Sequence, residues 1–202
     1  MGRRARFLAV SATGALALVG FVNGAASAAV APDSSTITIS GSGTGTVYMT
    51  KAYIANMAAH NITMTAMNPI SVTLQDTYTT TIWTTKSVNV GLNPLSGTVE
   101  FNGGTLVTNT VTGQQLLLTD IRFNATNHTI DYTVQTPAGA LTIHALDLAG
   151  TQSAGIKGST LTYSSSELFV DPAAASALDS VLGTDAFLDT ELFGGFTTSF
   201  TL

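Results

Sequence analysis

Short segments in which apolar and polar residues alternate recur along most of this chain. Residues 36–39 and 70–74 show the pattern clearly, because their isoleucine, valine and leucine side chains share one face of an extended strand. Glycines or Asn-Pro pairs separate such segments at intervals of roughly 8–12 residues. Closely spaced short strands are typical of a sandwich or a closed barrel. We therefore predict an all-β fold, an antiparallel β-sandwich.

Several strand boundaries follow from the same alternation. The threonine-rich residues 78–92 are expected to hold two strands. Residues 97–101 and 105–107 are expected to form a tight hairpin that turns at Gly103 and Gly104. Later strands are predicted at residues 115–118, 120–124, 129–134, 140–148 and 196–202, with turns at Gly139 and Gly150.

Two short helices interrupt the strands, and each has its own start and stop signals. In the later one, Asp171 is the expected N-cap, Pro172 stands at the first helical position and Gly183 ends the helix. The earlier one is expected to begin after Thr50 and to run over residues 51–60. The fold class is thus a β-sandwich with two short α-helices.

Residues 1–28 have the composition of a signal peptide. Three arginines precede the apolar residues 7–22, and Ala26-Ser27-Ala28 matches a cleavage site. We expect the mature chain to begin at Ala29 and residues 29–202 to form a single secreted domain. After the leader, no apolar run is long enough to cross a membrane. The predicted location is extracellular, free or held non-covalently at the cell wall.

The charge and the absence of cysteine narrow the function classes. Without the three leader arginines, four basic residues face twelve acids, a formal net charge of −8 that disfavours nucleic acid and anionic membrane surfaces as partners. A chain without cysteine has neither disulfides nor thiolate metal sites. A cell-wall component or another protein is the expected partner.

The sequence has no assembled catalytic motif, so we predict a non-enzymatic protein. It contains no G-x-S-x-G, no H-E-x-x-H and no phosphate-binding loop. His128 and His144 are interpreted as structural or exposed strand residues. The late acids, among them Asp185, Asp189 and Glu191, are interpreted as solvated charges, with a shared calcium ion or a hydrolytic carboxylate pair as alternatives.

One cluster near the first helix is a candidate binding site. All four methionines that follow the leader fall close to Tyr53 and His60, which are seven residues apart and would lie on nearly the same helix face. Thioethers and imidazole are suitable ligands for cuprous copper, whereas methionine also fills core gaps under a small helix. The candidate copper ligands are Met57, His60, Met64 and Met67.

Several segments resemble the alanine- and threonine-rich secreted proteins of actinobacteria that are related to HtaA-type haem-binding domains. The segments that carry this resemblance are the first helical unit up to Asn68-Pro69, residues 97–106, residues 117–123 and the closing stretch 171–194. The resemblance implies an HtaA-like or immunoglobulin-like sandwich. It also implies haem as a cofactor, held by a tyrosine with a supporting histidine, and Tyr53 with His60 or His128 are the residues available for these roles.

The chain departs from the haem-binding pattern of such domains at two places. Their Trp-x-x-Lys-x-Ser opening corresponds to a segment around Lys51 that has neither the tryptophan nor the serine. Their Phe-x-Gly-His-x-Gly-x-Leu hairpin corresponds to residues 101–106, which lack the histidine. The prediction is therefore a secreted binding or structural protein of the cell envelope, with haem or copper capture near the first helix as the alternative.

Overall fold

The computed structural model describes residues 36–39, 42–92, 95–136 and 139–201, which belong to one compact unit. The predicted signal peptide and its cleavage site lie outside these residues. The strands in the first half of the chain are β1 (Thr36–Ile39), β2 (Gly43–Thr50), β3 (Ile62–Met67), β4 (Ser71–Leu74), β5 (Tyr78–Leu92) and β6 (Leu95–Phe101). The later strands are β7 (Gly104–Asn109), β8 (Gln115–Asn124), β9 (Thr129–Thr136), β10 (Gly139–Lys157), β11 (Thr160–Val170) and β12 (Gly194–Thr201).

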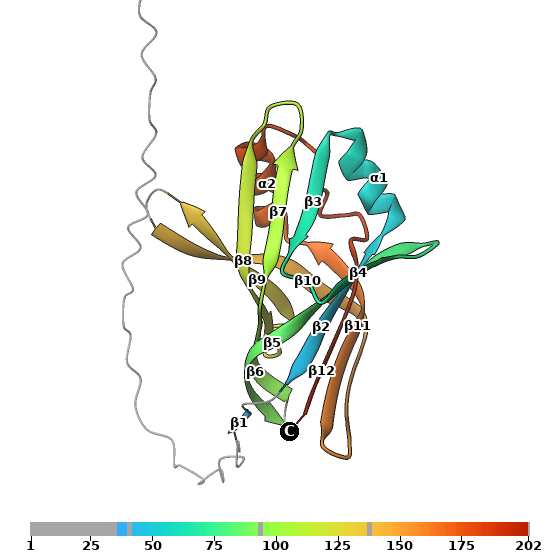
Figure 1. The fold of residues 1–202 in the computed structure, drawn as a ribbon, viewed down its shortest axis with the longest axis vertical. Helices are drawn as coiled ribbons and strands as arrows, with labels where there is room; N and C mark the ends of the chain where they lie inside the picture. The colour runs from blue at the N-terminus through green and yellow to red at the C-terminus, as the bar shows by residue number, and fades with distance from the viewer. Residues whose placement is uncertain (1–35, 40–41, 93–94, 137–138, 202) are drawn as a thin grey trace, which may run out of the picture. The chain divides into compact units, whose positions relative to one another are not determined.

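Eight of these strands form one antiparallel sheet that closes on itself (Figure 1). Their order around the ring is β5, β2, β12, β11, β10, β9, β8 and β6, and β6 pairs again with β5. The predicted sandwich is therefore corrected to a closed barrel, because the short ladder between β6 and β8 joins what would have been two separate edges. The prediction of a mainly β fold with two helices is confirmed.

The remaining strands extend the ring at two of its members. β7 pairs with β8 on one edge and with β3 on the other. β4 and β1 both pair with β5. The predicted hairpin between residues 97–101 and 105–107 is wrong. β6 and β7 each pair with β8, so they run in the same direction along one of its edges and not against each other. Gly103, at φ +126°, carries the chain between them, where a Cβ would meet the Met67 carbonyl and the Trp83 ring.

Three predicted strand breaks are instead irregularities within continuous strands. β5 is a single strand with a register shift between Thr85 and Ser87, and β8 shifts between Thr119 and Arg122. Gly150, predicted as a turn, lies at a third shift, within β10. Bulges absorb an extra residue and bend a strand, which lets these long strands curve around the ring.

Aromatic side chains fill the interior of the ring. Phe123 stacks against Tyr163 at 4.6 Å and Phe196 at 5.1 Å between ring centroids, and Phe101 contacts Phe196 edge-on at 6.2 Å. Three of these, Phe101, Phe123 and Phe196, are at most 2% exposed. In the last predicted strand, Phe196, Thr198 and Phe200 all face inward, whereas Leu202 lies outside the described residues.

Both helices form as their end signals predict. Helix α1 (Lys51–Ala59) is capped by Thr50, and helix α2 (Pro172–Leu182) by Asp171, with Gly183 in the left-handed conformation after it. Both lie toward the end of the sheet from which β3 and β7 extend (Figure 1). Among the described residues, no helix has the length and apolar character needed to span a membrane.

At Gly194, β12 and β2 approach each other closely. Gly194 pairs with Met49 of β2, and a Cβ on it would overlap the Tyr48 carbonyl oxygen, a backbone atom that cannot move aside. We predict that Gly194→Ala lowers the free energy of unfolding by about 1–3 kcal/mol or more, as measured by urea denaturation. Gly155→Ala is the matched control, because a Cβ there meets nothing, and it should stay within about 0.5 kcal/mol of the parent. Equal stability of both variants would contradict the close strand approach.

Candidate functional site

An apolar cavity of about 350 Å³ lies beneath α1, between β3 and β4. No ladder joins these two strands in the described part of the chain, since β3 pairs with β7 and β4 with β5. The sheet is therefore open at this point, and α1 covers the opening. The residues that line this space, the α1 cavity, are Val47, Met49, Ile54, Met57, Ala58, Ile62, Thr63, Met64, Ala66, Val72, Leu74, Thr79, Thr81, Trp83, Thr105, Tyr132 and Phe193.

Hydrogen bonds at the start of α1 hold the helix over the cavity. Thr50 accepts from the Tyr53 backbone N–H at 3.2 Å and donates to the Leu192 carbonyl at 3.0 Å. Its own backbone N–H donates to the Phe193 carbonyl at 2.9 Å. The cap of α1 is thus tied to the segment that leads into β12, which is distant in sequence. This tie fixes the position of Phe193, one of the cavity walls.

Trp83 forms another part of the cavity wall. Its ring is 4% exposed, and its indole N–H donates to the Met67 carbonyl at 3.2 Å. Met67 is the last residue of β3, and Asn68 follows in the left-handed conformation at φ 51°. The same aromatic side chain therefore forms part of the cavity wall and anchors the turn from β3 to β4.

The mouth of the cavity is apolar and faces solvent. Val72 is 53% exposed and Leu74 is 79% exposed, although both contribute to the lining. None of the described lining residues carries a formal charge. Thr79 adds one unused polar group, a buried hydroxyl that has no hydrogen-bond partner among the described residues. A neutral molecule with a large apolar surface and few polar atoms is complementary to such a wall.

Tyr53 belongs to α1, and its side chain does not line the α1 cavity. Its ring is fully buried against Phe193 at 4.8 Å, next to a separate space of about 30 Å³. Its hydroxyl has no hydrogen-bond partner within the described structure. Burial, with a smaller contribution from the Glu191 and Asp179 carboxylates, raises the pKa of Tyr53 well above its ordinary value. Tyr53 is therefore held as a neutral phenol.

His60 is not beside Tyr53, although their spacing placed them on one helix face. It is the C-cap residue, with φ −97° and ψ 14°, so its side chain leaves the helical path. Its Nδ1 lies 2.9 Å from the Asn56 carbonyl, and its Nε2 lies 3.5 Å from Asp185 at the surface. Of the predicted copper ligands, Met57 and Met64 line the α1 cavity, whereas Met67 and His60 do not.

The residues present do not fit a haem held by tyrosine. The Tyr53 hydroxyl adjoins a space far too small for a macrocycle, and its raised pKa disfavours the phenolate that iron would require. Among the described residues, no histidine lines the α1 cavity, and Tyr132 is the one tyrosine in its wall. Burial raises the pKa of Tyr132 to about 12, despite an opposing hydrogen bond with Thr105. His128 lines neither of these spaces. Its Nδ1 lies 3.3 Å from the Tyr163 hydroxyl instead.

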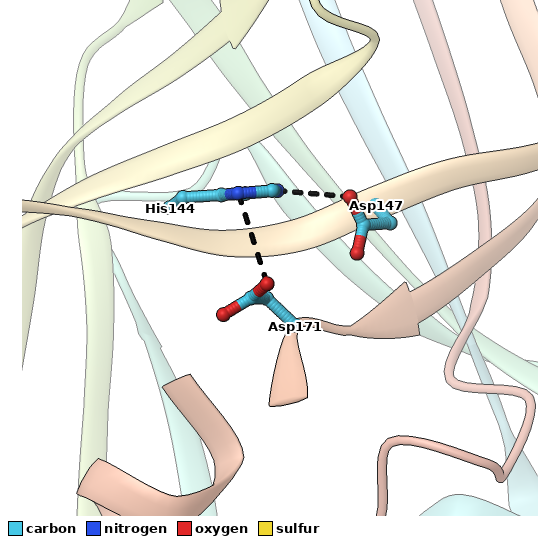
Figure 2. Close-up of side chains that lie close together, drawn as sticks. All are labelled: His144, Asp147 and Asp171. Atoms are coloured by element: carbon cyan, nitrogen blue, oxygen red, sulfur yellow. Dashed lines mark ion pairs between the residues drawn. The ribbon is translucent and has the colours of Figure 1, made fainter. Parts of the chain in front are cut away.

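The structure brings together a second group of titratable side chains that the sequence did not predict to be neighbours. His144, Asp147 and Asp171, here called the His144 cluster, converge from β10 and the cap of α2 (Figure 2). His144 Nε2 lies 3.0 Å from the Asp147 carboxylate, and Nδ1 lies 3.8 Å from that of Asp171. Asp171 was predicted only as a cap and His144 only as a strand residue. An i, i+3 spacing within a strand gives no signal of proximity unless a bulge is known.

The fold and the cavity define a closed antiparallel β-domain with a helix-covered apolar pocket. No protein-family model matches the sequence, and no curated protein matches it. Among solved structures, the chain is similar to the C-terminal domain of HtaA from Corynebacterium glutamicum, with a TM-score of 0.53 and 14% sequence identity, over 80% of this chain and 98% of that one. The predicted HtaA-like relation is thus supported in its fold.

The unpaired hydroxyl of Tyr53 generates a stability prediction. Tyr53→Phe removes the hydroxyl and keeps the ring, so we expect the free energy of unfolding to stay equal or to rise by about 1 kcal/mol. Tyr53→Ala empties the site under α1 and should cost about 3–5 kcal/mol. Chemical denaturation measures both. A loss above about 1 kcal/mol in Tyr53→Phe would mean that the hydroxyl has a partner after all.

Asp179 of α2 should make stability depend on pH. The pKa of Asp179 is raised above its ordinary 3.8, mainly because burial removes water from the carboxylate and also because the Asp185 carboxylate is near. Backbone hydrogen bonds with Phe187 and Ala186 oppose this rise. A raised carboxyl pKa means that ionisation costs stability in the folded state, so its contribution is lost as the pH rises above 3.8. Asp179→Asn keeps an acceptor for the Phe187 N–H.

We therefore expect the Asn variant to gain stability relative to the parent as the pH rises through the carboxyl range. Thermal unfolding at a series of pH values measures the difference between the two proteins. A difference that stays constant across the series would refute the raised pKa of Asp179.

Proposed function

We propose that the chain is an exported, non-enzymatic protein that binds a neutral apolar small molecule in the α1 cavity. The single observation that carries this proposal is the opening between β3 and β4, with its apolar wall and charge-free lining. The volume of about 350 Å³ falls at the lower end of the range of about 300–1,000 Å³ that small-molecule sites occupy.

The physical basis for binding is the burial of ligand apolar surface. Each Å² removed from water contributes about 25 cal/mol, so a ligand that covers the apolar walls gains several kcal/mol before entropy costs are subtracted. The exposed Val72 and Leu74 at the mouth are themselves an apolar surface that a bound ligand would cover.

We infer export from the predicted signal peptide, and the composition of the domain agrees with it. An acidic, cysteine-free chain rich in threonine is common among extracellular β-domains. The likeness to a domain of HtaA adds support for a binding role, but it rests on fold. We place the protein outside the membrane, free or non-covalently associated with the envelope.

Haem and copper are the alternative ligands, and each needs different ligand atoms from the protein. Haem would need an iron ligand, and the α1 cavity offers it no described histidine. Cuprous copper would use the thioethers of Met49, Met57 and Met64, which line the same space. Ordinary gap filling under α1 accounts for these methionines equally well.

Two exposed residues near β4 provide a matched test. Val72 is 53% exposed and lines the cavity mouth, whereas Ile70 is 55% exposed and does not line it. We predict that the purified protein binds the neutral fluorophore N-phenyl-1-naphthylamine with enhanced emission, and that Val72→Asp weakens this binding at least about tenfold. Ile70→Asp should bind as the parent does. Both variants should fold, since both positions tolerate water.

The outcomes separate the proposal from its alternatives. No saturable fluorescence change, or an equal loss in both variants, would overturn a ligand site at the cavity mouth. A haemin titration followed by absorbance runs beside it. A sharpened Soret band that disappears in Tyr53→Phe would establish tyrosine-held haem and replace the proposal of a neutral ligand.

A further inference from the structure

The His144 cluster lies outside the α1 cavity and has a donor set of its own. One imidazole and two carboxylates each offer a ligand atom, and these three atoms lie within 4.8 Å of one another (Figure 2). The side chains of His144 and Asp147 are 41% and 45% exposed, and that of Asp171 is 20% exposed. The group is therefore open to solvent on one side and packed on the other.

A β-bulge brings these side chains together. The ladder between β10 and β9 shifts register between His144 and Leu146, so that Ala145 and Leu146 both face inward. His144 and Asp147 consequently emerge on the same outer face although they are three residues apart. The Asp171 backbone N–H donates to the Ala145 carbonyl at 3.0 Å, which attaches the cap of α2 to the bulge. Bulges commonly re-aim side chains in this way at functional sites.

The two carboxylate oxygens of Asp171 face different groups, one the start of α2 and the other His144. Oδ1 accepts from the backbone N–H groups of Ala173 and Ala174, each at 2.9 Å, and so caps α2. Among the described residues, the cap hydrogen bonds use Oδ1, whereas Oδ2 lies 3.8 Å from Nδ1 of His144. The carboxylate thus presents a free oxygen whose position is fixed by the cap. Such pre-positioning lowers the cost of holding a ligand to an ion.

The cluster and the neighbouring Asp131 carry more negative than positive charge. Asp131 of β9 stands opposite His144 in the ladder and lines a polar groove with His144 and Asp147. The nearest cation in the ladder, Arg122, is bound to Glu100 at 2.7 Å. Within the described residues, no lysine or arginine forms an ion pair with Asp131, Asp147 or Asp171. Three carboxylates therefore face one imidazole, which attracts a cation.

We propose that the His144 cluster is a binding site for a divalent first-row transition metal ion of the zinc type. Imidazole nitrogen with carboxylate oxygen is a donor set for zinc and its neighbours, whereas calcium takes oxygen ligands alone. Ligand atoms around a tetrahedral zinc ion lie about 3–3.5 Å apart, and the His144–Asp147 distance of 3.0 Å is already close to this range. Nε2 of His144 now faces Asp147 and Nδ1 faces Asp171, so an ion held by one ring nitrogen and both carboxylates requires these exposed side chains to rotate from their present contacts.

The consequence of such a site is a metal link between β10 and the start of α2. His144 and Asp147 belong to the sheet and Asp171 to the helix cap, so an ion bound to all three joins the two elements. Water molecules in the adjacent groove complete the coordination. The proposal stands independently of the α1 cavity, which shares none of these residues.

Calorimetric titration of ZnCl₂ into the purified, tag-free protein at pH 7.5 tests the site. We expect one saturable binding event per chain, and His144→Gln and Asp147→Asn should each weaken it by about tenfold or more. Asp171→Asn should weaken it as well and still cap α2, because asparagine is an N-cap as good as aspartate. The matched control is His128→Gln, which removes an exposed imidazole outside the cluster and should leave zinc affinity unchanged.

A second measurement keeps the result clear of folding effects. Circular dichroism and the thermal midpoint without metal should be alike in the parent, His144→Gln and His128→Gln. Zinc should then raise the midpoint of the parent and of His128→Gln, but not that of His144→Gln. Absence of saturable zinc binding in the parent would overturn the proposal, leaving an imidazole paired with carboxylates. Zinc binding that survives His144→Gln would overturn it too.

Discussion

The short ladder between β6 and β8 is the contact on which the rest of the architecture depends. It joins only residues 98–100 to residues 122–124, yet it converts an open sheet into a ring. Because β6 uses one end of the β8 edge, the other end is free for β7, and β7 in turn carries β3. Closure at one end thus produces an opening at the other, between β3 and β4, where α1 sits over an apolar space.

Local sequence signals predicted the helices and most strands. They did not predict which strands pair with one another. The caps at Thr50 and Asp171 and the left-handed Gly183 depend on residues a few positions apart, so the helices were predictable. The hairpin at Gly103 was not, because a glycine with positive φ permits a turn as readily as a change of partner along β8. A sandwich and a closed ring differ in one three-residue ladder between segments distant in sequence.

Helical periodicity did not correctly place His60 relative to Tyr53. Seven residues are nearly two full turns, so Tyr53 and His60 would share a face if the helix continued through both. The helix ends at Ala59, and His60 turns outward toward Asp185 while Tyr53 remains in the core. The walls that matter most, Trp83 and Phe193, lie far from α1 in sequence, and only the ring places them beneath it.

Both proposed sites lie where the regular ladder is interrupted, and each interruption supplies a different chemistry. A missing ladder between β3 and β4 exposes inward-facing apolar side chains, which creates a pocket suited to an apolar molecule. The bulge at Ala145 leaves the ladder intact on both sides but sets His144 and Asp147 on one outer face. Since aromatic side chains pack the interior of the ring, both proposed sites use places where the regular pairing of strands is interrupted.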